Sequence, residues 1–133
     1  MEMKKAEHKK VVYILGCFNE KGLEHYAAVE EMLTELGYET ISRVLIPEGM
    51  DRVKENRIAI AMMDAADAVV LLPNLEDSDD AVAERYLAYS FDKPMVLVKL
   101  GHRNVYDPGV NPPDIVKAWL KHDLEKALWE VSA

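Results

Sequence analysis

The segment from Ala66 to Val98 limits the possible fold more than any other part of the chain. It contains the apolar run Asp-Ala-Val-Val-Leu-Leu-Pro, then an acidic loop, a helical stretch that carries Glu84, and Lys-Pro-Met-Val-Leu-Val. This order predicts a strand, a helix and a second strand joined by a parallel crossover. The loop after the first strand then lies at the carboxyl end of the sheet, where open α/β folds bind ligands. Glu84 is therefore the first candidate for a functional residue.

The rest of the chain also alternates between strand and helix patterns. Short apolar runs bounded by turn residues predict strands at 11–15, 38–46, 68–72 and 94–100. Apolar residues at helical spacing, with Asp51 as one cap and Asp77 or Ser78 as another, predict helices at 23–36, 51–63, 77–91 and 114–130. Right-handed crossovers favour a flavodoxin-like or Rossmann-like α/β sandwich of three layers, with a parallel sheet of strand order 2-1-3-4. In that order the loops after Leu15 and Leu72 lie at the same edge.

Composition narrows the class of protein. The chain has 133 residues, half of them apolar, which is enough for one domain, expected over residues 11–133 after a polar leader at 1–10. Its 16 Lys and Arg against 24 Asp and Glu give a net charge of −8, which opposes binding to nucleic acid or anionic membranes. No apolar run approaches the roughly 20 residues that span a bilayer, and the N-terminus is polar, so we expect a cytoplasmic protein.

The sequence also argues against a bound metal or cofactor. Cys17 is the single cysteine, and no set of histidines has the spacing of a zinc site. Gly16 is a lone glycine after the first strand, so the dinucleotide-binding fingerprint is missing. We therefore expect no cofactor and no metal.

The residues alone leave more than one interpretation open, both for Glu84 and for the acidic cluster near it. A lone helical glutamate is ordinarily solvated, here within reach of Arg85 or Lys93, but Tyr13 on the first strand could orient it across the sheet. The start of the same helix carries an acidic cluster of four residues, Glu76, Asp77, Asp79 and Asp80. This cluster can form a well-capped, solvated helix end, bind a cation, or repel a phosphate.

Four segments resemble the nucleoside 2-deoxyribosyltransferase superfamily, and within it a small, largely uncharacterised branch. They are Val-Tyr-Ile-Leu-Gly at 12–16, Ala-Asp-Ala-Val-Val-Leu-Leu at 66–72, Ser-Asp-Asp-Ala-Val-Ala-Glu at 78–84 and Asp-Lys-Pro-Met-Val at 92–96. The resemblance covers Val11 to about Val98 and leaves out the C-terminal helix. It implies a small-molecule nucleoside or nucleotide as substrate, and a homo-oligomer, because sites of this family are often completed across a subunit interface.

The resemblance also implies roles for individual residues. Glu84 matches the nucleophile that attacks C1′ of deoxyribose to form a glycosyl-enzyme, and Tyr13 matches the tyrosine that positions it. Ser78 matches a serine of the branch that hydrolyses deoxynucleoside monophosphates. The remaining candidates for substrate binding are Gly16, Cys17 and Phe18 in the loop after the first strand, Asn56 near the base, and Asp80 near the sugar.

Two positions depart from the family pattern and keep a second hypothesis open. Ala59 stands where the enzymes carry an aspartate that handles the leaving base, and Asp80 stands where they carry a glycine. The first hypothesis is an N-glycosidase or deoxyribosyltransferase acting on a deoxynucleoside or its monophosphate. The alternative is a non-catalytic nucleotide-binding or assembly module that kept the fold and lost the chemistry. The acidic cluster further predicts a preference for the uncharged nucleoside over its 5′-phosphate.

Overall fold

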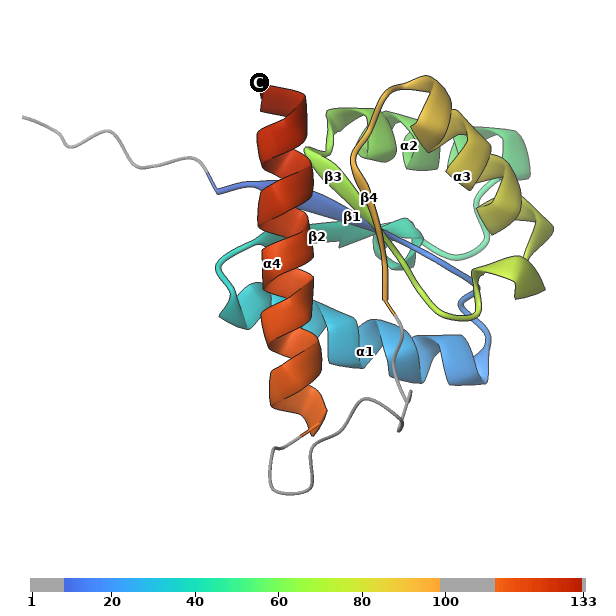
Figure 1. The fold of residues 1–133 in the computed structure, drawn as a ribbon. Helices are drawn as coiled ribbons and strands as arrows, with labels where there is room; N and C mark the ends of the chain where they lie inside the picture. The colour runs from blue at the N-terminus through green and yellow to red at the C-terminus, as the bar shows by residue number, and fades with distance from the viewer. Residues whose placement is uncertain (1–8, 99–111, 133) are drawn as a thin grey trace, which may run out of the picture.

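A computed structural model describes residues 9–98 and 112–132, with the side chains of all of these except 112–118 and 131–132. The described residues form a parallel sheet flanked by helices (Figure 1). Its strands are β1 (Val11–Leu15), β2 (Glu39–Ser42), β3 (Ala68–Leu71) and β4 (Met95–Leu97). The strand order is β2-β1-β3-β4, and every neighbouring pair is parallel. The predicted fold class and strand order are confirmed.

Four helices connect or follow these strands, and side chains cap three of them. They are α1 (Glu20–Glu35), α2 (Arg52–Ala65), α3 (Asp79–Ser90) and α4 (Pro112–Ser132). Asn19 caps α1 by accepting a hydrogen bond from the Gly22 N–H at 2.8 Å, so this helix starts earlier than the apolar pattern predicted. Asp51 caps α2, as predicted, and of the two candidates for α3 it is Ser78 whose side chain forms the cap.

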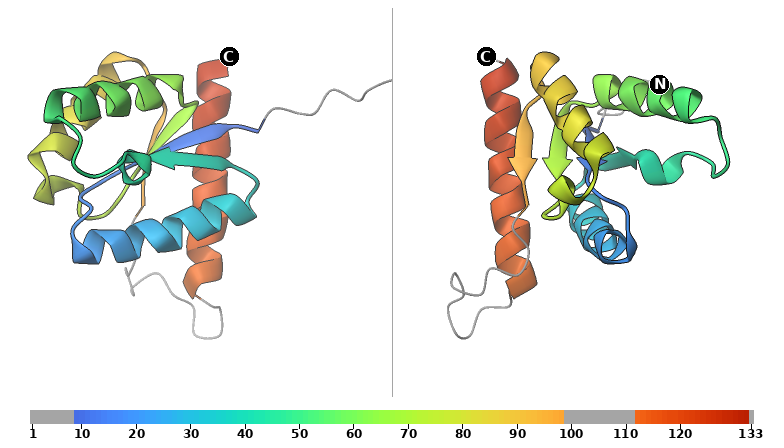
Figure 2. Two further views of the ribbon diagram at one scale, coloured as in Figure 1. Left: turned by 180° about the vertical axis from the view of Figure 1, so that it is seen from behind. Right: turned by 90° about the vertical axis from the view of Figure 1, so that its right-hand side faces the viewer.

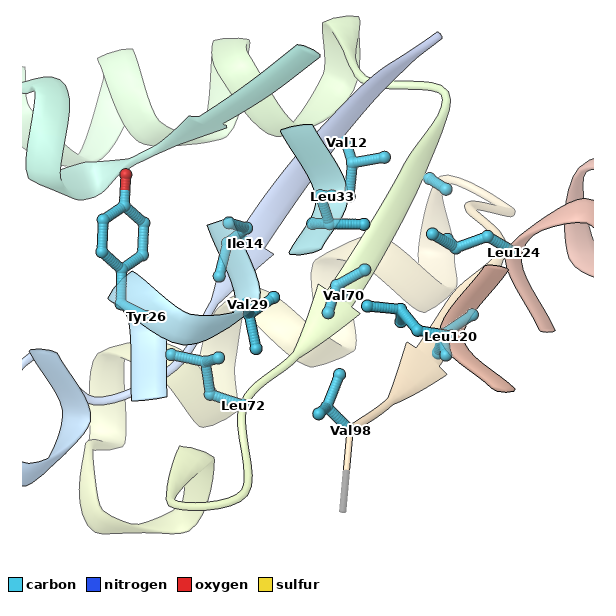
Figure 3. Packing of buried hydrophobic residues seen from close by; sticks show 12 residues of the cluster. Val12, Ile14, Tyr26, Val29, Leu33, Val70, Leu72, Val98, Leu120 and Leu124 are labelled. Carbon is cyan, nitrogen blue, oxygen red and sulfur yellow. The ribbon is translucent and has the colours of Figure 1, made fainter. Parts of the chain in front are cut away.

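Side chains of alternate strand residues pack into two separate cores, one on each face of the sheet. The first core lies under α1 and α4 (Figures 2 and 3); its members include Val12, Ile14, Val70, Leu120 and Leu124. Figure 3 shows Leu120 of α4 directed toward Val70 of β3. The second core lies under α2 and α3 and contains Tyr13, Leu15, Met63, Val69 and Ala88. The odd-numbered side chains of β1 therefore face the helix that carries Glu84.

The second strand is shorter than predicted. The apolar pattern indicated a strand over 38–46, but β2 ends at Ser42 and the chain turns into a short 3-10 helix, η1 (Arg43–Leu45). The Ser42 hydroxyl causes this turn, because it accepts a hydrogen bond from the Val44 N–H at 3.2 Å. As a result, Arg43 lies just past the carboxyl end of β2.

Several predicted boundaries fall outside the described residues. The polar leader is one of them, since the description starts at residue 9; the end of the strand predicted over 94–100 is another, since it stops at residue 98. Within the part of the chain that is described, no helix is long and apolar enough to cross a membrane.

Candidate active site

Glu84 lies on the buried face of α3, against the sheet. The buried residues of α3 are Ala81, Glu84 and Ala88, a spacing of three and four that puts all three on one side of the helix. The two alanines let the helix backbone approach the sheet closely. Glu84 is 3% exposed, which contradicts the interpretation of a solvated helical glutamate.

Two hydrogen-bond donors from other elements hold the Glu84 carboxylate. The Tyr13 hydroxyl, on β1, donates to Oε2 at 2.9 Å. The Arg43 guanidinium, on η1, donates from Nε to Oε1, and its Nη2 also lies against that oxygen. The partners suggested by sequence proximity are engaged elsewhere: Lys93 donates to main-chain oxygens of Asp64 and Ala66, and Arg85 lies 4.0 Å from Glu76.

Arg43 also joins α3 to α2. Its Nη1 donates to the Glu55 carboxylate at 3.1 Å, and its Nη2 donates to the Asn56 side-chain oxygen at 2.9 Å. Side-chain exposure rises along this cluster from 3% at Glu84 through 14% at Arg43 to 38% at Glu55. The cluster therefore runs from the protein interior to the surface, and its solvent side is at α2.

The electrostatics of the cluster follow from burial and pairing. Burial raises the pKa of Glu84, and the Arg43 charge and the Tyr13 hydroxyl offset part of that rise. Burial also raises the pKa of Tyr13, and the Glu84 charge raises it further, so this hydroxyl stays a donor. Burial by itself would lower the pKa of Arg43, but the interactions with Glu84, Tyr13 and Asp80 together outweigh burial and raise it. The arrangement pairs the Glu84 carboxyl group with one cation and one neutral donor in a largely buried setting.

Two of the acidic residues near the start of α3, Asp80 and Glu76, lie against different arginines. Arg52 of α2 donates to the Asp80 carboxylate at 2.9 Å, at an exposed position. The Ser78 side-chain oxygen accepts from the Ala81 N–H at 3.2 Å, while the Glu76 side chain is 84% exposed. No group of three or more acidic, histidine or cysteine side chains among the described residues is arranged to hold a metal ion.

The loop after β1 is tied to the loop after β3, as the strand order predicts. The Asn74 amide donates to the Cys17 main-chain oxygen at 3.1 Å and to the Asn19 side-chain oxygen at 3.3 Å. Gly16 packs so closely on Leu72 that an added Cβ would lie 2.7 Å from the Leu72 Cβ. Phe18 packs edge-on against Tyr26, with ring centroids 5.6 Å apart, and joins the core under α1 and α4.

The predicted site residues thus fall into groups. Glu84 and Tyr13 are in direct contact, and Asn56 joins them through Arg43. A second group lies at the start of α3 and consists of Ser78 and Asp80. A third group is in the β1 loop, where the contacts of Gly16 and Phe18 are with core side chains and Cys17 is partly buried. Substrate binding by this third group stays a prediction.

Sequence reasoning missed Arg43 and Glu55. Arg43 was included in a continuous strand over 38–46, where an arginine carries no signal of its own. The available signal was Ser42, because a serine before an apolar run can turn the chain by capping a nearby N–H. Glu55 and Asn56 follow Asp51 by one helical turn and slightly more, which puts all three at the start of α2.

The fold is similar to that of solved structures of the nucleoside 2-deoxyribosyltransferase-like superfamily. Residues 10–97 match a family model described as a domain of unknown function, DUF4406, and the chain belongs to this family. No curated protein sequence matches the chain.

Solved structures of similar fold include two enzymes. A 2-deoxyribosyltransferase from the psychrotolerant bacterium Bacillus psychrosaccharolyticus is 25% identical, with a TM-score of 0.57 over 65% of this chain and 70% of that one. The CMP N-glycosidase BcmB of Clostridium botulinum is 17% identical, with a TM-score of 0.55 over 66% of this chain and 70% of that one. The solution structure of BlsM is 18% identical, with a TM-score of 0.61 over 94% of this chain and 95% of that one.

Proposed function

We propose that the chain is an N-glycosidase or deoxyribosyltransferase acting on a deoxynucleoside or its monophosphate, with Glu84 as the nucleophile. The observation that carries the proposal is the Glu84 carboxylate, which is 3% exposed yet held by donors from β1 and η1. Keeping a carboxylate buried is costly unless it is paired. Similarity to a 2-deoxyribosyltransferase and to a CMP N-glycosidase supports the choice of reaction.

In the proposed reaction, a Glu84 oxygen attacks C1′ of the sugar and the bond from C1′ to the base nitrogen breaks. The bonding electron pair leaves with the base, which takes a proton from water. Water then displaces Glu84 from C1′ and gives a proton to the hydroxide left by the first step, which yields the free sugar. Alternatively, a second base displaces Glu84 and loses its N–H proton to that hydroxide, which yields a new nucleoside. Each carboxylate oxygen has two lone-pair directions, and Oε2 accepts one hydrogen bond, from Tyr13, so one direction on that oxygen is open for the attack.

The exposure gradient of the cluster suggests how a substrate would lie. Because the cluster opens to solvent at Glu55, we propose that the base lies near Asn56 and that the sugar lies beside the Arg43 guanidinium, within reach of Glu84. Ser78 and Asp80 would then approach the far side of the sugar or its 5′ substituent. Tyr13 orients Glu84, and Gly16, Cys17 and Phe18 complete the site from the β1 loop in this proposal.

The test is base release from a panel of substrates. Purified protein would be incubated with deoxynucleosides, their monophosphates and CMP, alone or with a second base, and free and exchanged bases would be separated by chromatography. Glu84→Gln keeps the size of the side chain and removes the nucleophile, so we expect a loss of roughly 10³-fold or more. The matched control is Glu76→Gln, which neutralises an exposed carboxylate near the start of the same helix. Release that survives Glu84→Gln would remove Glu84 from the mechanism.

A second candidate function is a binding or assembly module without catalysis. Ala59 favours it, because this position is completely buried in α2 and presents no acid to a leaving base. Asp80 also favours it, since its charge is paired with Arg52 rather than left for a substrate. Calorimetric binding of a nucleoside or nucleotide, without base release from any member of the panel, would support this function.

A further inference from the structure

The contacts of Arg43 set it apart from two other cations that the structure describes, Lys93 after α3 and Arg52 on α2. Lys93 donates to main-chain oxygens, and Arg52 pairs with Asp80 at an exposed position. Arg43 is 14% exposed, and its one guanidinium donates to Glu84, Glu55 and Asn56. A planar fork of donors can serve three acceptors on two helices, which a lysine ammonium does less well.

The charges around Glu84 show why this contact matters. Glu84 faces Tyr13 from β1, Arg43 from η1 and Asp80 from its own helix, and Glu55 of α2 lies beyond Arg43. Burial and the Asp80 charge both favour a protonated Glu84, whereas Tyr13 supplies a neutral donor. Arg43 is therefore the one positive charge in contact with Glu84 among the described residues, and a protonated carboxyl is a poor nucleophile.

We infer that Arg43 is a positioning residue that keeps Glu84 ionised at neutral pH and aims its carboxylate at the sugar, with Glu55 and Asn56 holding the guanidinium in place. The role of Arg43 in catalysis rests on the proposed function, but its effect on the ionisation of Glu84 does not. When Glu84 becomes bonded to the sugar it loses its charge, and Glu55 still balances Arg43. The guanidinium can then stay in place to receive the carboxylate released in the second step.

The inference is tested by the ionisation of Glu84 itself. Carboxyl ¹³C chemical shifts of protein labelled at glutamate would be followed against pH, and the Glu84 signal identified as the one lost in Glu84→Gln. Arg43→Gln should raise the titration midpoint of Glu84 by about one pH unit or more, a tenfold change in proton affinity. Arg85→Gln is the matched control: it removes a cation of the same helix that lies against Glu76 and keeps the Arg43–Glu84 contact, so the midpoint should stay the same.

A second variant covers the case in which Arg43→Gln does not fold. Arg43→Lys keeps the charge and loses the planar fork, so we expect a smaller rise of the Glu84 midpoint. An unchanged midpoint in whichever folded variant is measured would overturn the inference. If base release is found, the acid limb of its pH profile should move upward with the midpoint. If no substrate reacts, the proposed function fails, while the titration still decides whether Arg43 controls Glu84.

Discussion

The two faces of the sheet are built from the same strands, yet they carry different chemistry. Under α1 and α4, large aliphatic side chains such as Leu33 and Leu124 fill the space between helix and strand. Under α2 and α3 the core includes the small helix residues Ala81 and Ala88, and a polar cluster lies beside the apolar core. The first face is suited to stability, and the second has room for a buried carboxylate and its donors.

The difference begins with the two-residue period of β1. Val12 and Ile14 point to the α1 and α4 face, while Tyr13 and Leu15 point to the other face. Tyr13 is completely buried, and its hydroxyl can be satisfied because Glu84 lies opposite. One strand therefore contributes to both the apolar core and the candidate site. Changes to either face should separate stability from the properties of Glu84.

The largest expected effect is a loss of stability from the apolar face. Leu124 of α4 is completely buried, so Leu124→Ala should lower the free energy of unfolding by about 2–5 kcal/mol. The titration midpoint of Glu84 should stay the same, because Leu124 packs on the opposite face. Urea unfolding and carboxyl NMR measure the two quantities. Leu97→Ala, at a side chain 52% exposed, is the control and should change stability by under about 0.5 kcal/mol. A moved Glu84 midpoint in Leu124→Ala would show that the two faces are coupled.

The next largest effect is a pH-dependent loss of stability on the face of the sheet that carries Tyr13 and Glu84. Glu84 has a folded-state pKa above its ordinary value of 4.5, so its contribution to stability is largest below that pH and falls as pH rises through the folded pKa. Tyr13→Phe removes a hydrogen bond to the charged form and raises that pKa further. The variant should therefore be less stable by about 1.5–3 kcal/mol at neutral pH, with a smaller difference near pH 4.

Urea unfolding at several pH values measures this difference. The control is the same substitution in the Glu84→Gln background. Residue 84 then has no carboxylate to titrate, so the extra pH dependence of the Tyr13→Phe penalty should vanish. A Tyr13→Phe penalty that is equal at both pH values would mean that the hydroxyl stabilises the fold without sensing the charge of Glu84.

A smaller effect is expected at the start of α3. Ser78 caps the helix through the Ala81 N–H, so Ser78→Ala should cost about 1 kcal/mol of stability. Ser78→Asp keeps a capping oxygen and should cost much less, as thermal unfolding of both variants would show. If Ser78→Ala lowers base release by more than its loss of folded protein, the hydroxyl also contacts substrate. Equal losses would limit Ser78 to the cap.

Parts of this comparison could be predicted from the sequence and parts could not. The strand order and the Tyr13–Glu84 approach follow from buried runs and right-handed crossovers, which bring β1 beside β3 and place α3 over both. Arg43 could not be placed, because its position depends on whether the chain continues or turns after Ser42. A single side-chain hydrogen bond, from the Val44 N–H to Ser42, decides this. Glu55 could not be recognised from the sequence either, because its contact with Arg43 depends on where Arg43 lies.

The smallest expected effect concerns the charge of the substrate. The described residues of the candidate site carry three negative charges, on Glu84, Glu55 and Asp80. They carry two positive charges, on Arg43 and Arg52. Each positive group is already paired with a carboxylate, which reduces its net attraction for a phosphate.

We therefore expect a deoxynucleoside to bind more tightly than its 5′-monophosphate. At an effective dielectric constant of about 20, a unit charge about 8 Å away contributes roughly 2 kcal/mol before screening. A Debye length of about 8 Å at physiological ionic strength reduces this to a difference of a few-fold in affinity. Calorimetry with both ligands should show that the preference shrinks at high salt. Tighter binding of the monophosphate in the presence of a chelator would contradict this expectation, because no metal ion would then neutralise the carboxylates.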